Sequence, residues 1–408
     1  MHMRIGMKEV GPGNPTYVIF EVASTHGNDW ETAKAYIAQA ADAGANAVKF
    51  QLFTADTLIN PLTPGLKGTY DYFKTAETPR EWFPKLKVLC DEKGIDLLCT
   101  PFDIDSARFL DEVGVPAVKI ASGELTNLQL LESVATFGKP IIVSTGMATM
   151  QEVERAVHIL RTNGAKEIAL LQCVSVYPTS FEDANVSAMN TLGDALDTII
   201  GYSDNGSVGA LVPLMAVAMG ASIIEKHVTS KKERGSLDDV FSMSVEEFAQ
   251  MVMKIRAIDA RADKKEVLKE LREEFGADFD KALGDGIKRP APHGTLVTHP
   301  GVEGEFRMKE ADERQWARRG VYLNQAVAKG TTITKEMLTL LRPDIGISSV
   351  DYERVIGTVA GEDLPPMLPL KMQGEAVVLF HKADIAPTYA DPSEAGFVKM
   401  LGETALFA

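Results

Sequence analysis

Short apolar segments recur along the first two thirds of the chain, and each ends in a charged or polar side chain. Apolar runs of this length are typical of strands buried in a parallel sheet. Polar groups at one end of many parallel strands are typical of the catalytic mouth of a (β/α)8 barrel. The pattern therefore predicts an enzyme, and it names candidate residues at the segment ends: Glu21, Lys49, Gln51, Thr100, Lys119, Ser144, Asp204 and Glu225-Lys226-His227.

Strand and helix patterns alternate to about residue 262. The apolar segments predict eight strands, at residues 17–22, 45–51, 95–100, 116–121, 140–145, 167–173, 197–202 and 221–227. Helical periodicity predicts helices at 30–43, 80–93, 104–113, 126–137, 149–163, 185–195, 207–219 and 244–262. The repeat favours a TIM barrel over residues 1–270, although an open doubly wound sheet also accommodates eight strands.

Helix boundaries support this division. Asp29, Thr149 and Ser244 are suited to be N-caps, because their side-chain oxygens can accept hydrogen bonds from the first helical turn. Glycine supplies the left-handed conformation at a helix C-terminus. Six glycines are placed for this role: Gly44, Gly94, Gly114, Gly138, Gly164 and Gly220.

The pattern changes after residue 270. Residues 271–316 are first charged and then rich in Pro, Gly and His, which predicts a helix extension followed by a linker. Residues 317–380 predict a small second domain with short strands at 320–323 and 376–379. The C-terminal tail, 381–408, gives no pattern from which structure could be inferred.

Composition narrows the function classes. The chain has 408 residues, 45% of them hydrophobic, and a formal charge of −15, which argues against a nucleic-acid binder or a partner of anionic membranes. The three cysteines lie in apolar segments, as expected for reduced, buried thiols. No secretory signal and no apolar run of about 20 residues is visible, so we expect a cytoplasmic, soluble protein.

Two lysines carry the clearest chemistry. Lys49 and Lys119 end different strands, and with the hydroxyls of Thr100, Ser122 and Ser144 they favour a pocket for phosphate or carboxylate. Ion pairs with Glu21 and Glu124 are the alternative for either lysine. A Schiff base requires a neutral amine, so the nearby acids argue against one.

The histidine at the end of the eighth strand leaves several alternatives open. His227 could be a hydrogen-bonded core residue, a ligand of a divalent metal or a proton-transfer group. The spacing of the sequence does not decide among them.

Several longer stretches resemble the sialic acid synthase family of nonulosonate synthases, which condense phosphoenolpyruvate with an N-acylated sugar aldehyde. The resemblance covers about residues 15–260, and residues 318–347 resemble that family's antifreeze-like SAF domain. The matching stretches are Ala45-Asn-Ala-Val-Lys-Phe-Gln51, Thr100-Pro-Phe-Asp103, Lys119-Ile-Ala-Ser-Gly-Glu-Leu-Thr-Asn127, Gly138-Lys-Pro-Ile-Ile-Val-Ser-Thr-Gly-Met147, Gly201-Tyr-Ser-Asp204, Ile224-Glu-Lys-His227, Arg318-Arg-Gly-Val-Tyr322, Gly330-Thr-Thr-Ile-Thr334 and Leu341-Arg-Pro343 followed by Gly346-Ile347.

The resemblance implies roles for the candidate residues. Glu21 and Glu124 would flank the cationic C2 centre and handle the proton of the attacking water. A divalent metal, Mn²⁺ or Mg²⁺, would polarise the aldehyde oxygen. Gln51, Tyr177 and Asp238 would line the sugar site, and Arg342 would reach the sugar from the partner subunit of a domain-swapped homodimer. The phosphate and carboxylate of phosphoenolpyruvate would be held by Lys49, Thr100, Lys119, Ser122 and Ser144.

The chain departs from the family pattern on the acceptor side. Where the family has a second metal-binding histidine after Tyr-Ser-Asp, this chain has Asn205, so His227 is the remaining histidine ligand. A neutral amide oxygen is a weak ligand for a borderline metal, although it suits Mg²⁺ or Mn²⁺. His26 could replace the missing histidine or form a loop hydrogen bond. The family's Pro-Asp-His reads Leu237-Asp-Asp239 here.

Three functions remain compatible with these observations. The leading one is a phosphoenolpyruvate-dependent synthase with an unusual acceptor aldehyde. The second is a sugar-binding homologue that has lost its metal site at Asn205. The third is a Schiff-base pyruvate aldolase that uses Lys49 or Lys119.

Overall fold

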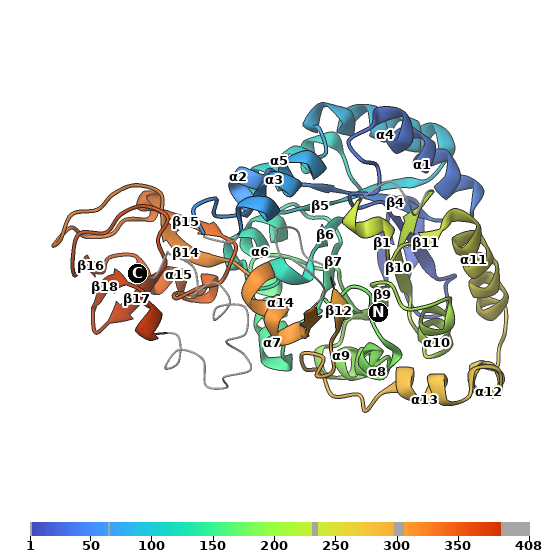
Figure 1. The fold of residues 1–408 in the computed structure, drawn as a ribbon. Coiled ribbons are helices and arrows are strands. Elements are labelled where there is room, and N and C mark those ends of the chain that lie inside the picture. The colour runs from blue at the N-terminus through green and yellow to red at the C-terminus, as the bar shows by residue number, and fades with distance from the viewer. Residues whose placement is uncertain (1, 64–65, 231–235, 298–305, 385–408) are drawn as a thin grey trace. The chain divides into compact units, whose positions relative to one another are not determined.

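The structure is a computed structural model that describes residues 2–63, 66–230, 236–297 and 306–384 (Figure 1). It contains two compact units. The first comprises Met1–Phe53, Ala76–Leu125 and Gln129–Thr295, and the second comprises Thr54–Thr75, Thr126–Leu128 and Leu296–Ala408. Most of the predicted tail, from residue 385 onward, lies outside the described residues.

The first unit is a parallel barrel, which confirms the predicted fold class. Its strands pair in the order β5-β4-β3-β10-β9-β8-β7-β6, and β5 and β6 are neighbours as well, so the sheet nearly closes. A short strand, β11 (Met243–Ser244), extends the sheet beside β10. All eight predicted strands are present: β3 (Tyr17–Glu21), β4 (Ala47–Leu52), β5 (Asp96–Pro101), β6 (Val118–Ile120), β7 (Ile141–Ser144), β8 (Ile168–Gln172), β9 (Ile199–Asp204) and β10 (Ile223–Thr229).

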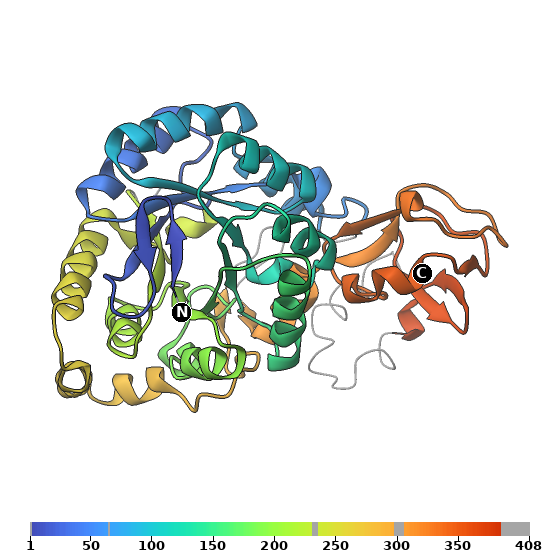
Figure 2. The ribbon, with the colours of Figure 1, turned by 180° about the vertical axis from the view of Figure 1, so that it is seen from behind.

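Helices surround these strands on the outside, as the opposite views in Figures 1 and 2 show. Outward-facing strand residues such as Val18, Phe20 and Val48 pack with the apolar helix faces in one buried cluster. The helices are α1 (Trp30–Asp42), α4 (Phe83–Lys93) after the 3-10 turn η1 (Arg80–Trp82), α5 (Ile104–Val113), α6 (Leu128–Ala135), α7 (Met150–Thr162), α8 (Phe181–Ala184), α9 (Ala188–Leu196), α10 (Leu211–Ala218) and α11 (Val245–Asp259).

The helix boundaries follow the predicted signals. The Asp29 side chain accepts a hydrogen bond from the Thr32 amide, and Thr149 and Ser244 each form a capping box with a glutamate three residues later. All six predicted glycines have positive φ angles, with Gly94 and Gly114 as left-handed C-caps. Local sequence therefore determines where several of the barrel helices begin or end.

A hairpin that the sequence analysis did not predict lies against the N-terminal end of the barrel (Figure 2). Its strands are β1 (Met3–Ile5) and β2 (Lys8–Val10). Met3, Ile5 and Val10 share a buried cluster with the first inward-facing residues of the strands. This end of the barrel is thus filled with apolar side chains, and the polar strand ends lie at the opposite end.

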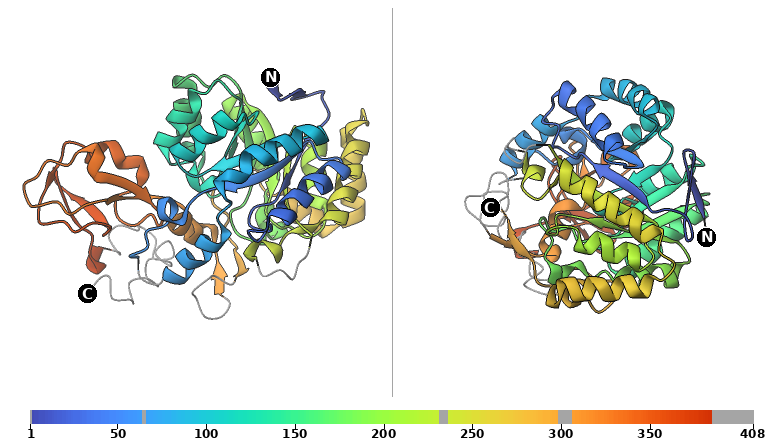
Figure 3. Two further views of the ribbon diagram at one scale, coloured as in Figure 1. Left: turned by 90° about the horizontal axis from the view of Figure 1, so that it is seen from above. Right: turned by 90° about the vertical axis from the view of Figure 1, so that its right-hand side faces the viewer.

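Two further helices, α12 (Lys264–Phe275) and α13 (Ala277–Leu283), continue the first unit after α11, as the side view in Figure 3 shows. They lie partly in the segment expected to be a linker, and the compact unit extends to Thr295. The proposed domain boundaries remain predictions. No helix of the described segments is long and apolar enough to cross a membrane.

The second unit has its own small core, formed by residues such as Val321, Leu323 and Val377. It includes both predicted strands, β14 (Gly320–Leu323) and β18 (Ala376–Leu379). β14 pairs antiparallel with β15 (Leu338–Leu341), and β18 lies between β16 (Val359–Ala360) and β17 (Leu370–Gln373). Its other elements are α2 (Ala55–Leu58), most of α3 (Lys67–Ala76), β13 (Phe306–Met308), which pairs with β12 (Thr295–Val297), α14 (Glu310–Ala317), η4 (Lys335–Met337), η5 (Ser349–Asp351), α15 (Tyr352–Val355) and η6 (Lys382–Asp384).

Candidate active site

The alternation of side chains along a strand explains how the candidate residues meet. Ile19 and Ala47 belong to the cluster inside the barrel, so Glu21 and Lys49, two positions further on, also point inward. The same argument applies to the other strands. It places Gln51, Thr100, Lys119, Ser144, Ser203, Glu225 and His227 on the inner face, toward the C-terminal end.

Two polar strand-end residues have the opposite orientation. Tyr202 and Ile224 belong to the outer core, so Asp204 and Lys226 also face the helices. They form a buried ion pair, with Lys226 Nζ 2.6 Å from Asp204 Oδ2, and Asp204 also accepts hydrogen bonds from Ser207. This pair is part of the barrel wall, not of its mouth.

Lys49 is held as an ammonium ion in the mouth. Its Nζ lies 2.8 Å from Glu21 Oε2, donates a hydrogen bond of 2.8 Å to Thr100 Oγ1 and lies 3.7 Å from Glu225 Oε1. Burial alone would lower the pKa of Lys49, but the carboxylates of Glu21 and Glu225 outweigh burial and raise it. Gln51 Nε2 donates to the other oxygen of Glu21, at 3.1 Å.

Lys119 has fewer negative partners. Its Nζ donates to Ser144 Oγ at 2.6 Å and to the Ile120 carbonyl at 3.1 Å, and it lies 3.8 Å from Glu225 Oε2. Burial outweighs the effect of Glu225, so the pKa of Lys119 is lowered. The proximity of Ser144, Ile120 and Glu225 still provides partners for an ammonium group.

Glu225 joins the two lysines, a role that the sequence analysis did not assign to it. It is buried between their ammonium groups and accepts a hydrogen bond from Ser203 Oγ at 3.3 Å. Burial by itself would raise the pKa of Glu225, but Lys119 and Lys49 outweigh it and lower the pKa. The charge on Glu225 therefore offsets the positive charge of Lys49 and Lys119.

A second polar group surrounds the turn after β7. Ser122 Oγ and Ser175 Oγ lie 3.0 Å apart, and a Cβ on Gly146 would lie 2.2 Å from Ser175 Oγ, so only glycine fits there. Lys288 is buried, and its Nζ donates to the Gly146 carbonyl and, at 3.2 Å, to Gln172 Oε1. Lys288 is thus a further cation beside the candidate anion pocket.

Sequence reasoning missed Lys288 because it lies in the Gly-rich and Pro-rich segment that was expected to be a linker. A lone lysine in such a segment carries no signal of burial. Ser175, which follows β8, was also missed. Glu124, which was predicted, is fully buried in the short turn η2 (Ser122–Glu124), two residues after Ser122.

An aromatic cluster forms another part of the mouth. The ring centroids of His227 and Phe241 lie 5.2 Å apart, those of His227 and Tyr177 5.8 Å, and those of Tyr177 and Phe241 4.9 Å. Tyr177 and Phe241 are half-buried, whereas His227 is buried. Of these three rings, only Phe241 was not a candidate from the sequence.

Asp238 and Asp239, in the short turn η3 (Leu237–Asp239), have different environments. Asp238, a predicted sugar-site residue, accepts hydrogen bonds from the Ser24 amide, at 2.9 Å, and from the Ser24 hydroxyl. Asp239 is fully buried and accepts from Thr229 Oγ1, at 2.7 Å, and from the Ser236 amide, at 3.1 Å. Asp239 therefore stabilises the loop around η3 (Leu237–Asp239).

The predicted metal ligands form only part of a metal centre. His227 Nδ1 is buried and has no hydrogen-bond partner among the described residues, as a free ligand would. Asn205 Nδ2 donates to the Val174 carbonyl at 2.6 Å, which leaves the amide oxygen as its possible ligand atom. Within the described parts of the chain, no group of three or more His, Cys, Asp or Glu side chains could hold a metal ion. These residues do not fit a metal centre built of protein ligands alone.

His26 is a structural residue of the loop after β3. Its Nε2 lies 3.0 Å from Thr78 Oγ1, its Nδ1 accepts from the Asn28 amide at 3.0 Å, and its ring lies against Trp82 and Phe50. Burial lowers the pKa of His26 to about 4, so the ring is neutral at pH 7. Because both ring nitrogens are engaged, His26 does not replace the missing histidine.

Arg342 belongs to the second unit, where it directly follows β15. Its backbone amide donates to the Leu58 carbonyl at 2.9 Å, and its carbonyl accepts from the Asn60 amide at 2.8 Å. Segment 54–75 and the end of β15 thus share hydrogen bonds within this unit. The predicted contact of Arg342 with a sugar stays a prediction.

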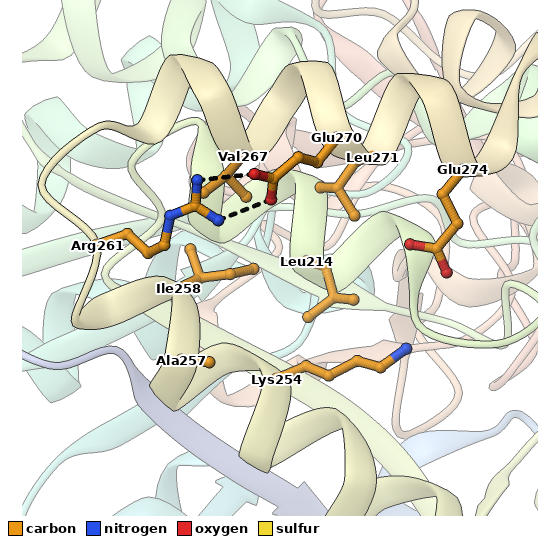
Figure 4. A pocket seen from close by; sticks show the side chains of 9 residues that line it. All are labelled: Leu214, Lys254, Ala257, Ile258, Arg261, Val267, Glu270, Leu271 and Glu274. Atoms are coloured by element: carbon orange, nitrogen blue, oxygen red, sulfur yellow. Dashed lines mark hydrogen bonds and ion pairs between the residues drawn. The ribbon is translucent and has the colours of Figure 1, made fainter.

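A separate pocket of about 220 Å³ lies on the outer wall of the barrel, between α10, α11 and α12 (Figure 4). Leu214, Ile258 and Leu271 contribute apolar surface, and Arg261 forms a two-fold hydrogen-bonded ion pair with Glu270 at its edge. No predicted site residue lines this pocket, so the polar mouth remains the candidate active site.

Comparison with known proteins agrees with the fold. A model of the NeuB family matches residues 36–267, which is more than half of the chain, and a model of the SAF domain matches residues 318–370. The chain belongs to the NeuB family. This membership confirms the resemblance identified from the sequence motifs.

Characterised relatives of this NeuB-family chain are similar over most of its length. The N,N'-diacetyllegionaminic acid synthase of Legionella pneumophila is 34% identical over 86% of this chain and 92% of its own. The pseudaminic acid synthase of Helicobacter pylori is 30% identical over 87% and 96%. The crystal structure of the spore coat polysaccharide biosynthesis protein spsE of Bacillus subtilis matches with a TM-score of 0.74, at 30% identity over 93% of this chain and all of that one.

Proposed function

We propose that this protein condenses phosphoenolpyruvate with an N-acylated sugar aldehyde, giving a nonulosonic 2-keto acid and phosphate. The supporting observation is the buried pair Lys49 and Lys119, joined through Glu225 and bonded to the hydroxyls of Thr100 and Ser144. Such a mouth suits a small substrate with a phosphate and a carboxylate. The names of the relatives, synthases of legionaminic and pseudaminic acids, support the same reaction.

In this proposal phosphoenolpyruvate, the donor, binds between the cluster around Lys49 and Lys119 and the cluster around the turn at Gly146. Lys49, Thr100, Lys119, Ser122 and Ser144 hold the carboxylate and phosphate of phosphoenolpyruvate, as the resemblance implies. Lys288 and Ser175 extend the phosphate end. Because phosphoenolpyruvate is strongly anionic, it would compete with Glu225 for the ammonium groups of Lys49 and Lys119.

The reaction then needs one new carbon–carbon bond and the removal of both protons from a water molecule, whose oxygen becomes the 2-keto oxygen. C3 of phosphoenolpyruvate attacks the aldehyde carbon, which leaves positive charge at C2 and converts the aldehyde oxygen to a hydroxyl group by proton uptake. Water adds at C2, and Glu21 or Glu124 accepts its first proton, which replaces the proton taken up by the aldehyde oxygen. The C2–O bond to phosphate then breaks as the new C2 hydroxyl loses the second proton to the departing phosphate, which gives the 2-keto acid. The carboxylates would stabilise the cationic C2 centre electrostatically.

The acceptor would bind on the side of the mouth that carries Tyr177 and His227. Gln51, Tyr177 and Asp238 would line the sugar site, and Arg342 would reach it from the partner subunit of a homodimer. A divalent metal, Mn²⁺ or Mg²⁺, would be held by His227 and Asn205 together with water and substrate. We also propose that the protein is located in the cytoplasm.

A phosphate-release screen tests the proposal. Purified protein is incubated with phosphoenolpyruvate and a panel of N-acylated hexosamines and other aldoses, with and without Mn²⁺ or Mg²⁺. We expect phosphate only when both substrates are present, and none from a Lys49→Met variant that retains the wild-type circular dichroism spectrum. If no aldehyde gives phosphate and phosphoenolpyruvate does not bind, the proposal is wrong.

Asn205 at the expected metal position favours one competing function, a sugar-binding homologue without turnover. Calorimetry would then detect a sugar ligand with or without Mn²⁺, and the screen would give no phosphate. A Schiff-base aldolase is the remaining alternative, and borohydride with pyruvate would trap it on Lys49 or Lys119.

A further inference from the structure

Residues 284–294, which follow α13, form a strap that carries one buried lysine. Lys288 is buried, whereas the adjacent Ile287 is 57% exposed. A lysine is almost never fully buried unless other groups hold its amine. Here Lys288 Nζ donates to the Gly146 carbonyl and, at 3.2 Å, to Gln172 Oε1. The position of this amine therefore depends on the contacts that fix the strap.

Asn185, directly after α8, holds the strap on the N-terminal side of Lys288. Its side chain forms two hydrogen bonds of 2.9 Å: Nδ2 donates to the Ile287 carbonyl, and Oδ1 accepts from the Gly286 amide. The backbone of Asn185 is left-handed, with a φ angle of +45°, a conformation in which asparagine is enriched. Gly284 permits this close approach, because a Cβ there would lie 2.4 Å from Asn185 Oδ1. These contacts end one residue before Lys288.

Asp183, in α8, holds the strap on the C-terminal side of Lys288. Its buried carboxylate accepts hydrogen bonds from two consecutive amides, that of His293 at 3.1 Å and that of Gly294 at 2.9 Å. Hydrogen bonds in which one partner is ionised are stronger than those between neutral groups. The strap is thus tied on both sides of Lys288, by two side chains that lie two residues apart in the sequence.

The amine of Lys288 reaches the turn after β7, where hydroxyl groups of the candidate anion pocket gather. A Cβ on Gly146, whose carbonyl binds Lys288, would lie 2.2 Å from Ser175 Oγ and 2.5 Å from Ser122 Cβ. In the proposed function these serines lie at the phosphate end of phosphoenolpyruvate. A displacement of the strap by about 1 Å exceeds the normal range of hydrogen-bond lengths, so it would separate the amine from a phosphate bound there.

We propose that Asp183 and Asn185 are positioning residues for phosphoenolpyruvate: they fix the strap so that Lys288 presents its amine at the phosphate end of the mouth. The proposal rests on the proposed function and deepens it, because it makes the affinity for the donor depend on two residues that act through Lys288. Neither residue would touch a substrate. The effect should be confined to phosphoenolpyruvate, because the strap contacts described here lead to the phosphate end and not to the acceptor side.

The test measures the Kd of phosphoenolpyruvate by calorimetry and the KM values of both substrates by phosphate release. Asp183→Asn removes the charge and one of the two acceptor oxygens. Asn185→Gly removes both side-chain hydrogen bonds and keeps the freedom that a left-handed backbone needs, so it guards against misfolding of the Asp183 variant. Each should raise the Kd by about 3- to 10-fold, since a hydrogen bond typically contributes a factor of about 2 to 10. The KM of the acceptor should stay unchanged.

Double variants separate positioning from a general weakening of the fold. In a Lys288→Met background, Asp183→Asn and Asn185→Gly should cause no further rise in the Kd, because the amine that they position is absent. Ile287→Ala is the matched control, since Ile287 is adjacent to Lys288 and its side chain is exposed. It should leave the Kd unchanged.

Two results would overturn the positioning role alone: an unchanged Kd in both single variants, or the same rise in the Kd with and without Lys288. Wild-type protein that neither binds phosphoenolpyruvate nor releases phosphate with any aldehyde would overturn the proposed function, and the positioning role with it.

Discussion

Glu225→Gln is the substitution whose effect on the mouth can be worked out most fully. Glu225 lies 3.7 Å from Lys49 Nζ and 3.8 Å from Lys119 Nζ, and all three groups are buried. At an effective dielectric constant of about 20, each pair contributes about 4 kcal/mol of attraction before the cost of desolvation. Removing one partner of a buried ion pair typically costs about 3–5 kcal/mol, because the remaining charge stays buried without compensation.

We therefore expect Glu225→Gln to lower the free energy of unfolding by about 3–5 kcal/mol. The pH dependence has a definite sign. Because the folded-state pKa of Glu225 is lowered, its contribution is present above the unfolded pKa of about 4.3 and is lost as the pH falls through the folded value. The variant should lack this loss of stability at acid pH.

Phosphoenolpyruvate should partly reverse the defect, because its anionic groups would replace the missing carboxylate beside Lys49 and Lys119. Urea unfolding with and without phosphoenolpyruvate measures both effects. The ligand should stabilise the variant more than the wild type. Glu270→Gln is the control, since Glu270 pairs with Arg261 in an exposed position and should cause little change. If Glu225→Gln matched the wild type in stability, or the ligand stabilised both proteins equally, our account of charge balance in the mouth would be refuted.

Three further variants test other parts of the site. Lys288→Met should raise the KM for phosphoenolpyruvate by about 10- to 100-fold through loss of a charged hydrogen bond, and steady-state kinetics with an unchanged KM would exclude Lys288 from the phosphate site. Asn205→His should increase the affinity for Mn²⁺ about 10-fold or more by adding an imidazole ligand, measured by calorimetry without substrates; unchanged affinity would mean that position 205 does not face a metal. The wild type should lose about 3 kcal/mol of stability between pH 6.5 and 4, because folding lowers the pKa of His26 from 6.5 to about 4, and His26→Gln should remove this loss. The substitution His158→Gln, at an exposed histidine, is the control and should leave the loss in place. Identical pH profiles of the two variants in urea unfolding would contradict the buried, neutral state of His26.

Much of the barrel could be predicted because its strands are buried on both faces and its helices carry local boundary signals. The apolar runs identified all eight strands, and Thr149 and Ser244 identified helix starts. The hairpin β1–β2 was missed because two strands of three residues are too short to show periodicity. The same limitation applies to α2, which has four residues.

The candidate site was only partly predictable, for two physical reasons. The position of a polar residue at a strand end does not reveal which face of the strand it occupies. Asp204 and Lys226 were therefore grouped with Lys49, although their ion pair lies on the side of the strands that faces the helices. Contacts between residues far apart in the sequence leave no local pattern. Lys288 reaches Gly146 across 142 positions, and the close approach of Phe241 to Gly206 is visible only from the geometry.

The most direct test of the central claim follows the fate of the oxygen that bridges C2 and phosphorus in phosphoenolpyruvate. We propose to label this oxygen with ¹⁸O and to analyse both products by mass spectrometry after turnover with an acceptor from the phosphate-release screen. Our account predicts that the label appears entirely in inorganic phosphate, because the C2–O bond breaks after water adds at C2. Label retained in the 2-keto acid would show cleavage of the P–O bond and would contradict the mechanism assigned to the buried lysines and glutamates.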